Sequence, residues 1–289
     1  MSTQPVTRHS MPIPAQGAPL LDIIRGAVTC LSFTSDSSLK AYLYVPKNLP
    51  KGRPARLFIA VHGISRNAEE HARRFAAYAE RHGLVLLAPF FSEDEYPRYQ
   101  RLGGRRGNLK RADLALLTML DELNAELNVD TSRFYLFGFS GGGQFAHRFA
   151  MAHPQRVISY VVAAAGWYTT PDPNMKFPRG IGPNRYFADL RFDLAAFLSI
   201  PATVIVGERD TKPGTSLNQA PRLMEEQGLH RLERGENWVF AMRETALAYG
   251  IDPHFDFVIA PRCGHSFRRA MRRGGVGDVV FNQFFPGKT

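Results

Sequence analysis

The segment 133–148, RFYLFGFSGGGQFAHR, constrains the fold of this chain more than any other part of the sequence. It opens with an apolar run, continues as GFSGG over 138–142, and leads into a stretch from 144 to 152 that suits a helix. This order predicts a buried strand, a tight turn at Ser140 and a following helix. Because the turn is sharp, the serine backbone must adopt a strained conformation. Gly138 and Gly142 then lie so close together that no larger side chain fits at either position.

The same turn would expose the Ser140 hydroxyl at the N-terminus of the helix. Free N–H groups and the helix dipole favour negative charge there. A serine in the pattern G-x-S-x-G between a strand and a helix is typical of a nucleophile. A phosphate-binding loop is disfavoured, because no Lys-Ser or Lys-Thr follows the glycines.

Apolar runs alternate with helical patterns along the rest of the chain. Strands are predicted at 27–33, 39–45, 55–61, 84–90, 133–138, 157–165, 202–206 and 255–260. Helices are predicted from 68 to Gly83 with Asn67 as N-cap, at about 110–127, at 144–152 and around 236–249, with a final amphipathic stretch over 266–285. This alternation predicts an α/β fold with a mainly parallel sheet and helices on both faces.

A chain of 289 residues with 44% hydrophobic content suits one domain, which we predict to span 27–289. Residues 1–26 are polar and proline-rich, so we expect a flexible leader. The segment 169–200 is rich in proline and glycine in its first half, and we predict an insertion that lies over the C-terminal edge of the sheet like a lid or cap. We expect a monomer or a homodimer.

The sequence shows no sign of a membrane-bound protein. No apolar run reaches the ~18 residues of a membrane span, and the N-terminus lacks the apolar core of a signal peptide. We therefore expect a cytoplasmic protein without a membrane partner; removal of an upstream leader would make it periplasmic or secreted instead.

The formal charge of +10 raises the question of nucleic acid or another anionic partner. The arginine pairs are scattered over distant segments and match no nucleic-acid-binding motif, which favours a solvated basic surface and no nucleic-acid partner. The cysteines, Cys30 and Cys263, are predicted to be free thiols. Cys263 lies two residues before His265, but the sequence supplies too few neighbouring ligands for a tetrahedral metal site. We expect neither a metal nor another cofactor.

Three residues with complementary chemistry follow predicted strands. Ser140, Asp210 and His265 come directly after the strands at 133–138, 202–206 and 255–260. In parallel sheets the carboxyl ends of the strands meet at one edge, where ligands bind. The order Ser, Asp, His is the order expected when a G-x-S-x-G turn supplies the nucleophile.

Other residues of the same types are less well placed. Asp189, Asp193, Asp252 and Asp256 do not follow an apolar strand at this edge, whereas Glu208 could take the place of Asp210. Asp210 could also be an ordinary loop carboxylate. Among the histidines, His254 lies at the opposite end of the last strand, and His62 belongs to a loop after the strand at 55–61.

The chain resembles the α/β-hydrolase-fold serine esterases over roughly residues 27–285. The resemblance rests on His62-Gly63-Ile64, on GFSGG at 138–142, on GERD at 207–210 and on CGHS at 263–266. The elbow GFSGGG, the downstream Gly-Trp-Tyr and the short insertion look like the poly(3-hydroxybutyrate) depolymerase-like and feruloyl-esterase-like group.

This resemblance implies roles for individual residues. Ser140 would be the nucleophile, His265 its general base, and Asp210 the carboxylate that orients the imidazole. The backbone N–H groups of Gly141 and Ile64 would form the oxyanion hole.

The resemblance also implies roles for two further residues. Trp167 would line the acyl or alcohol pocket, although packing beneath the 169–200 insertion explains it almost as well. His62 would shape the oxyanion loop rather than take part in the chemistry.

The sequence thus predicts a carboxylic ester hydrolase that works through an acyl-enzyme without a cofactor. The expected partner is a small-molecule or oligomeric ester: a short acyl ester, a hydroxyalkanoate oligomer or an ester of an aromatic acid. A peptidase of the same fold is the nearest alternative. A non-catalytic protein that retains the fold is another, and the net charge leaves a binder of anionic surfaces as a third.

Overall fold

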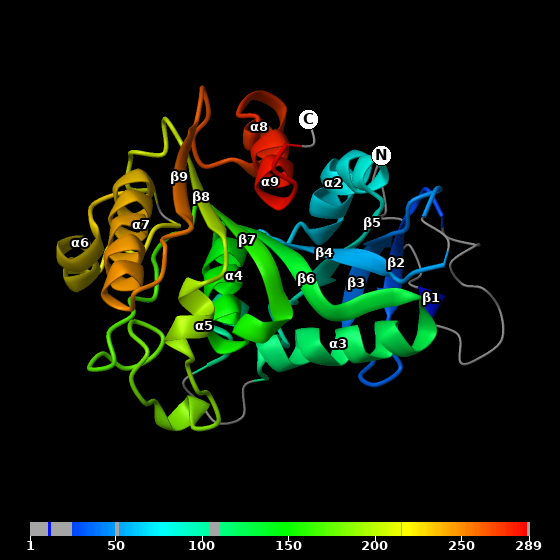
Figure 1. The fold of residues 1–289 in the computed structure, drawn as a ribbon, viewed down its shortest axis with the longest axis horizontal. Coiled ribbons are helices and arrows are strands. Elements are labelled where there is room, and N and C mark those ends of the chain that lie inside the picture. The colour runs from blue at the N-terminus through cyan, green and yellow to red at the C-terminus, as the bar shows by residue number, and fades with distance from the viewer. Residues whose placement is uncertain (1–10, 13–24, 50–51, 105–109, 215, 288–289) are drawn as a thin grey trace, which may run out of the picture.

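The computed structural model describes residues 11–12, 25–49, 52–104, 110–214 and 216–287. The described residues form a nine-stranded sheet in the order β1-β2-β3-β5-β4-β6-β7-β8-β9 (Figure 1). The strands are β1 (Met11–Pro12), β2 (Val28–Ser32), β3 (Lys40–Tyr44), β4 (Ala55–Val61), β5 (Leu84–Phe90), β6 (Val129–Phe139), β7 (Val157–Ala163), β8 (Ala202–Gly207) and β9 (Phe255–Ala260). The sheet contains a parallel run in the order β5-β4-β6-β7-β8-β9. Strand β3 is antiparallel to both of its neighbours, β2 and β5. The predicted α/β fold with a mainly parallel sheet is therefore confirmed.

Helices cover both faces of this sheet, as Figure 1 shows. The helices are α2 (Ala68–His82), α3 (Ala112–Glu126), α4 (Gly141–Ala152), α5 (Leu194–Leu198), α6 (Pro221–Gln227), α7 (Arg231–Ala248), α8 (Phe267–Arg273) and α9 (Val276–Phe284). Side chains of α3, α4, α5 and α7 belong to one buried cluster, and those of α2, α8 and α9 belong to a second one. Because the central strands lose solvent on both faces, they are apolar almost throughout.

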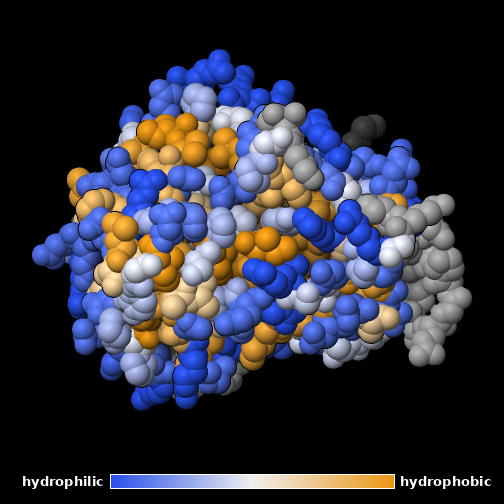
Figure 2. All heavy atoms as spheres, viewed as in Figure 1, coloured by the Kyte–Doolittle hydropathy of each residue, from blue (hydrophilic) through white to orange (hydrophobic). Residues whose placement is uncertain are grey.

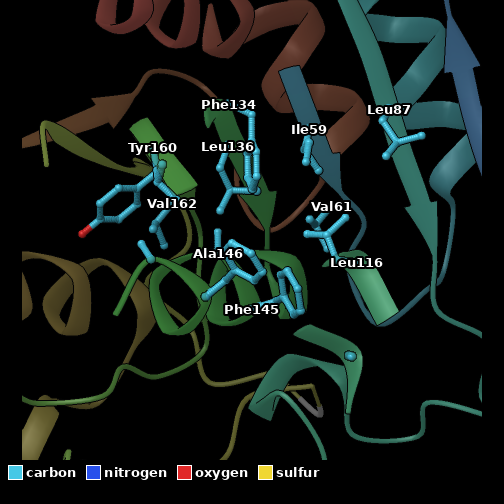
Figure 3. Packing of buried hydrophobic residues seen from close by; sticks show 14 of the residues in the cluster. Ile59, Val61, Leu87, Leu116, Phe134, Leu136, Phe145, Ala146, Tyr160 and Val162 are labelled. Atoms are coloured by element: carbon cyan, nitrogen blue, oxygen red, sulfur yellow. The ribbon is translucent and has the colours of Figure 1, made fainter. Parts of the chain in front are cut away.

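The helix after the serine turn packs directly on the middle of the sheet. Phe145 and Ala146 of α4 are fully buried against Val61, Leu136 and Val162 of three adjacent strands (Figure 3). This contact fixes the N-terminus of α4, and with it Ser140, relative to the ends of β4, β6 and β7.

Several element boundaries differ from those predicted. Helix α7 begins at Arg231 instead of about residue 236, and α6 lies where the sequence indicated only a polar loop. The final amphipathic stretch is divided into α8 and α9 at Gly274 and Gly275, and Gly275 has a φ of 65° that ordinary side chains rarely adopt. Asn67 precedes α2 as predicted, but its side chain makes no capping hydrogen bond with the backbone and instead donates to Glu70.

The segment 169–200 contains α5 and a short 3₁₀ helix, Arg185–Phe187. Its middle is fastened to the N-terminus of α3, because Arg111 forms an ion pair with Asp189 and lies over the ring of Phe187. Of the predicted leader, Met11–Pro12 form β1 and pair with β2. Most of the other residues in 1–26 lie outside the described part of the chain.

Two features of the structure concern anionic and membrane partners: the distribution of hydrophilic residues on the surface and the length and polarity of the helices. On the face seen in Figure 2, hydrophilic residues are distributed around apolar areas and are not gathered in one region. None of the helices in the described ranges is long and apolar enough to cross a membrane.

Candidate active site

Ser140 occupies a sharp turn between β6 and α4. Its φ of 55° and ψ of −112° lie far from the conformations that a serine prefers. Backbone hydrogen bonds hold the turn, because the Ser140 N–H donates to the Ala163 carbonyl of β7 at 2.7 Å and the Gln144 N–H donates to the Ser140 carbonyl at 3.1 Å. The strained conformation is thus maintained by the sheet on one side and the first helical turn on the other.

The glycines on either side of Ser140 allow this turn to form. A Cβ atom on Gly138 would lie 2.0 Å from the carbonyl oxygen of Gly142, and one on Gly142 would lie 2.1 Å from the carbonyl oxygen of Val61. Both distances are much shorter than any van der Waals contact, and the opposing atoms belong to the backbone. Neither position therefore has room for a side chain, as the sequence predicts.

The structure brings Ser140, His265 and Asp210 into one chain of hydrogen bonds. The Ser140 Oγ lies 2.9 Å from His265 Nε2, and His265 Nδ1 lies 2.8 Å from Asp210 Oδ2. Since a carboxylate only accepts hydrogen bonds, the proton belongs on Nδ1, and Nε2 is left to accept from the serine hydroxyl. Asp210 is 3% exposed, whereas the side chain of His265 is 24% exposed and can be reached by a substrate.

Asp210 and His265 follow two adjacent strands, β8 and β9. Asp210 follows β8 through a turn in which its N–H donates to the Gly207 carbonyl, and His265 follows β9. The two loops are joined where the Arg209 N–H donates to the Cys263 carbonyl at 2.9 Å. Hydrogen bonds between the loops therefore set the distance from His265 to Asp210.

The loop after β4 approaches the serine turn from the other side. A Cβ atom on Gly141 would lie 3.3 Å from the Ile64 backbone nitrogen, so these two peptide groups are neighbours. Gly141 is the first residue of α4, where backbone N–H groups have no acceptor within the helix. The two residues predicted to form the oxyanion hole therefore lie next to each other at the serine turn, and their role as donors stays a prediction.

The imidazole ring of His62 holds this loop through two hydrogen bonds, one that it accepts and one that it donates. The Phe91 N–H donates to Nε2 at 3.0 Å, so Nδ1 carries the proton and donates to the Gly63 carbonyl at 2.8 Å. Burial lowers the pKa of His62 to about 4, which keeps the imidazole neutral at physiological pH. The ring therefore shapes the loop, as expected from the sequence.

Tyr99 is a support that sequence reasoning missed. Its hydroxyl donates to the His62 carbonyl at 2.7 Å, and burial raises the pKa of Tyr99, so the phenol remains a donor. A Cβ atom on Gly141 would come within 2.7 Å of this hydroxyl, so Tyr99 also lies next to the first residue of α4. Tyr99 belongs to the irregular segment 91–109, whose sequence carries no periodic signal.

A cavity of about 300 Å³ opens at Ser140 and His265. Its other lining residues are a mixture of small, polar, aromatic and charged side chains: Gly63, Ile64, Ser65, Asn67, Glu70, Phe139, Ser216, Ser266, Phe267 and Arg268. None of the residues in 169–200 lines it. The prediction that this segment acts as a lid stays a prediction.

Trp167 does not line this cavity, in contrast to the expectation for it. The side chain is buried, and the guanidinium of Arg148 lies 4.0 Å from the centre of its ring. Arg148 in turn donates to Thr169 and to the Gln100 carbonyl. Trp167 therefore packs between the exit of β7, α4 and the 3₁₀ helix Tyr99–Arg101, which is the packing role considered as its alternative.

The rival acidic residues have other partners. Glu208 accepts from the Arg262 N–H, Asp193 caps α5, and Asp256 pairs with Arg243. The first of these contacts holds the loop that carries His265, so Glu208 supports the site without joining the hydrogen-bond chain.

Arg231 is a second residue that the sequence did not indicate. Its Nη1 lies 3.2 Å from Asp210 Oδ1, and its Nη2 donates to Ser216 Oγ at 2.9 Å. Arg231 and Asp210 are both almost completely buried. Asp210 thus accepts from His265 with one oxygen and from Arg231 with the other.

The two cysteines are not paired with each other. Cys30, half-buried on β2, and Cys263, buried after β9, are both free thiols. Within the described ranges, no group of three or more His, Cys, Asp or Glu residues could hold a metal ion.

Known proteins resemble this chain to different extents. No protein-family model matches it. Among curated proteins it is similar to feruloyl esterase B of Neurospora crassa, with 25% identity over 167 residues. That match covers 51% of this chain and 54% of the relative, so the chain spans about half the length of the curated relative that it matches.

Two solved structures are similar over most of their length. Poly(aspartic acid) hydrolase-1 from Sphingomonas sp. KT-1 is 28% identical with a TM-score of 0.69, and the match covers 86% of this chain and 92% of that one. A poly(3-hydroxybutyrate) depolymerase from Bordetella parapertussis is 26% identical with a TM-score of 0.72, and the match covers 91% and 89%. The chain has the α/β-hydrolase fold, and these likenesses support its resemblance to the serine esterases of that fold.

Proposed function

We propose that this protein is a serine carboxylic ester hydrolase that works through an acyl-enzyme on Ser140. The observation that carries the proposal is the hydrogen-bond chain from Ser140 through His265 to Asp210 at a solvent-accessible cavity. A serine hydroxyl is a weak nucleophile unless a base removes its proton. The Nε2 atom of His265 lies within hydrogen-bond distance of that proton, and Asp210 holds the imidazole in the tautomer that can accept it.

The reaction would proceed in two halves. Ser140 Oγ attacks the ester carbonyl while its proton passes to His265, and the backbone N–H groups of Gly141 and Ile64 stabilise the oxyanion. His265 then protonates the leaving alcohol, which leaves the acyl group on Ser140. In the second half His265 removes a proton from water, the resulting nucleophile attacks the acyl carbonyl, and the acid is released as Ser140 regains its proton. Each oxyanion-hole donor of this kind typically contributes about 2.7–4 kcal/mol.

The cavity favours small or narrow substrates. A volume of about 300 Å³ lies at the lower end of the range for ligand pockets, and several polar side chains line it. Short acyl esters and the ends of hydroxyalkanoate oligomers suit these dimensions better than long fatty acyl chains. The similarity to a feruloyl esterase and to a poly(3-hydroxybutyrate) depolymerase keeps aromatic acid esters and oligomers among the candidates.

A second candidate is hydrolysis of an amide in the same cavity, which would make the protein a peptidase-like hydrolase. The observation that favours it is the similarity to poly(aspartic acid) hydrolase-1 at 28% identity. Amide and ester hydrolysis need the same nucleophile, base and oxyanion hole, but an amide also requires protonation of a poorer leaving group. The two functions therefore differ in whether the protein hydrolyses an ester or an amide.

Hydrolysis of p-nitrophenyl esters from acetate to palmitate tests the first function. We expect activity that is greatest for short chains and that Ser140→Ala lowers by at least about 10³-fold. Ser199→Ala, at an exposed serine outside the cavity, is the matched control and should retain wild-type rates. Wild-type rates in Ser140→Ala would refute the assignment. Release of monomers from poly(aspartic acid), with no turnover of any ester, would favour the second function.

A further inference from the structure

We infer that Arg231 is a positioning residue for Asp210, and this inference rests on the proposed function. The guanidinium contacts two acceptors from different parts of the site. Nη1 lies 3.2 Å from Asp210 Oδ1, the carboxylate oxygen that His265 does not use, and Nη2 donates to Ser216 Oγ at 2.9 Å. Ser216 lines the cavity in which Ser140 and His265 lie. One side chain therefore joins the carboxylate to the wall of the cavity.

The placement of Arg231 is unfavourable for the helix that carries it. It is the first residue of α7, and the dipole at a helix N-terminus favours anions over cations. Its side chain is 2% exposed, and burial of a guanidinium costs free energy unless partners compensate it. Its ion pair with the buried Asp210 supplies this compensation, so the burial of Arg231 depends on that carboxylate.

The hydrogen bonds of Arg231 are made by its two terminal nitrogens and not by Nε. Its buried Nε atom has no hydrogen-bond partner among the described residues. The guanidinium is instead aligned so that its two terminal nitrogens face Asp210 and Ser216. A planar fork spans two acceptors in this way, whereas the single ammonium group of a lysine does not.

The consequence for catalysis follows from what Asp210 must do. With only the 2.8 Å hydrogen bond to His265, the carboxylate could rotate about its side-chain bonds and the imidazole could follow. Arg231 fixes the second oxygen through a charge-assisted hydrogen bond. It acts on the reaction through Asp210 and does not touch the substrate.

Arg234 offers a matched control on the same helix. It is also fully buried, but its Nε donates to the Gly228 carbonyl at 2.8 Å and its Nη1 donates to the Gly166 carbonyl at 2.6 Å. These are contacts with the backbone, and within the described residues no hydrogen bond joins Arg234 to Asp210. Arg234→Met therefore measures how kcat and Tm change when α7 loses a buried arginine that does not contact the Asp210 carboxylate.

The experiment compares Arg231→Met, Arg231→Lys, Arg234→Met and Ser140→Ala in p-nitrophenyl acetate hydrolysis and thermal unfolding. We expect kcat to fall by about 10²-fold in Arg231→Met, because small misplacements of catalytic groups cost that much, while KM changes less than about 2-fold. Arg231→Lys should recover part of this loss. Arg234→Met should lower the Tm but keep kcat.

Three results would overturn the inference: equal kcat in Arg231→Met and Arg234→Met, a rise in KM with unchanged kcat, or wild-type kcat in Arg231→Lys. If Arg231→Met does not fold, the kcat of Arg231→Lys relative to wild type still tests the inference. Activity that persists in Ser140→Ala would instead refute the proposed function, so the two failures are distinguishable.

Discussion

The ring of Phe139, the residue before Ser140, stacks on the imidazole of His265, with ring centroids 5.2 Å apart and ring planes inclined by 27°. The turn that presents the nucleophile thus also supplies a surface for its base. Phe267, two residues after His265, packs on the same phenyl ring at 5.5 Å. The imidazole is therefore held by a ring on one side and by Asp210 through its Nδ1 atom.

Replacement of this ring should slow the reaction. An aromatic pair is worth about 0.5–1.5 kcal/mol beyond its buried area, so Phe139→Leu should lower kcat by about 2- to 10-fold. Steady-state kinetics with p-nitrophenyl acetate measures the effect. Phe240→Leu, at a phenylalanine of α7 that is 65% exposed, should leave the rate unchanged. A lower Tm with normal kcat in Phe139→Leu would mean that the ring only packs.

Removal of one hydroxyl group tests the support of the oxyanion loop. Tyr99→Phe keeps the buried ring but deletes the hydrogen bond to the His62 carbonyl, which is worth about 0.5–1.5 kcal/mol. We expect kcat to fall by about 2- to 10-fold at similar KM. Tyr96→Phe is the control, since the Tyr96 ring also packs on Phe91, with centroids 5.5 Å apart. Equal rates in the two variants would contradict this role.

The serine turn should tolerate no side chain at Gly138. In Gly138→Ala the new Cβ would overlap a backbone carbonyl that cannot move away without breaking the first turn of α4. We expect a loss of at least about 3 kcal/mol in the free energy of unfolding, at the upper end for overpacked sites. Gly214→Ala, where nothing lies within 4 Å of the added atom, should change stability little. Urea denaturation of both variants measures the difference, and equal midpoints would disprove the steric argument.

A buried histidine should make the protein less stable in mild acid. His71 stacks on Phe267 with centroids 3.7 Å apart, and neither ring nitrogen has a hydrogen-bond partner among the described residues. Burial holds the pKa of His71 well below its usual value of 6.5, so the folded protein does not take up the proton that the unfolded chain binds. The contribution of the neutral ring is complete above about pH 6.5 and is lost as the pH falls below it, by up to about 1.4 kcal/mol per pH unit.

His71→Leu separates this histidine from the other acid-sensitive groups. The variant should gain stability relative to wild type, and the gain should be larger at pH 5 than at pH 7.5. Urea denaturation at both values measures it. The same pH dependence in variant and wild type would show that His71 does not cause the acid sensitivity.

Much of the fold could be predicted from local sequence because the strands and most helices carry strong periodic signals. The apolar runs at β4 and β5 and the glycine that ends α2 are local features, and they required no knowledge of the tertiary structure. Short elements within polar sequence, such as α6, could not be found in this way. Helix α6 contacts α7, which is a tertiary contact that the local sequence does not reveal.

The sequence by itself determined the strand–turn–helix unit around Ser140 and the order in which Asp210 and His265 follow it. These depend on steric and hydrophobic constraints between residues close in the chain. Only the tertiary structure decided that Arg231 and Phe139 contact that chain of hydrogen bonds, that Tyr99 holds the loop after β4, and that Trp167 does not line the cavity. Such contacts join residues from separate loops and helices, and their distances depend on how the helices pack on the sheet, which no local pattern encodes.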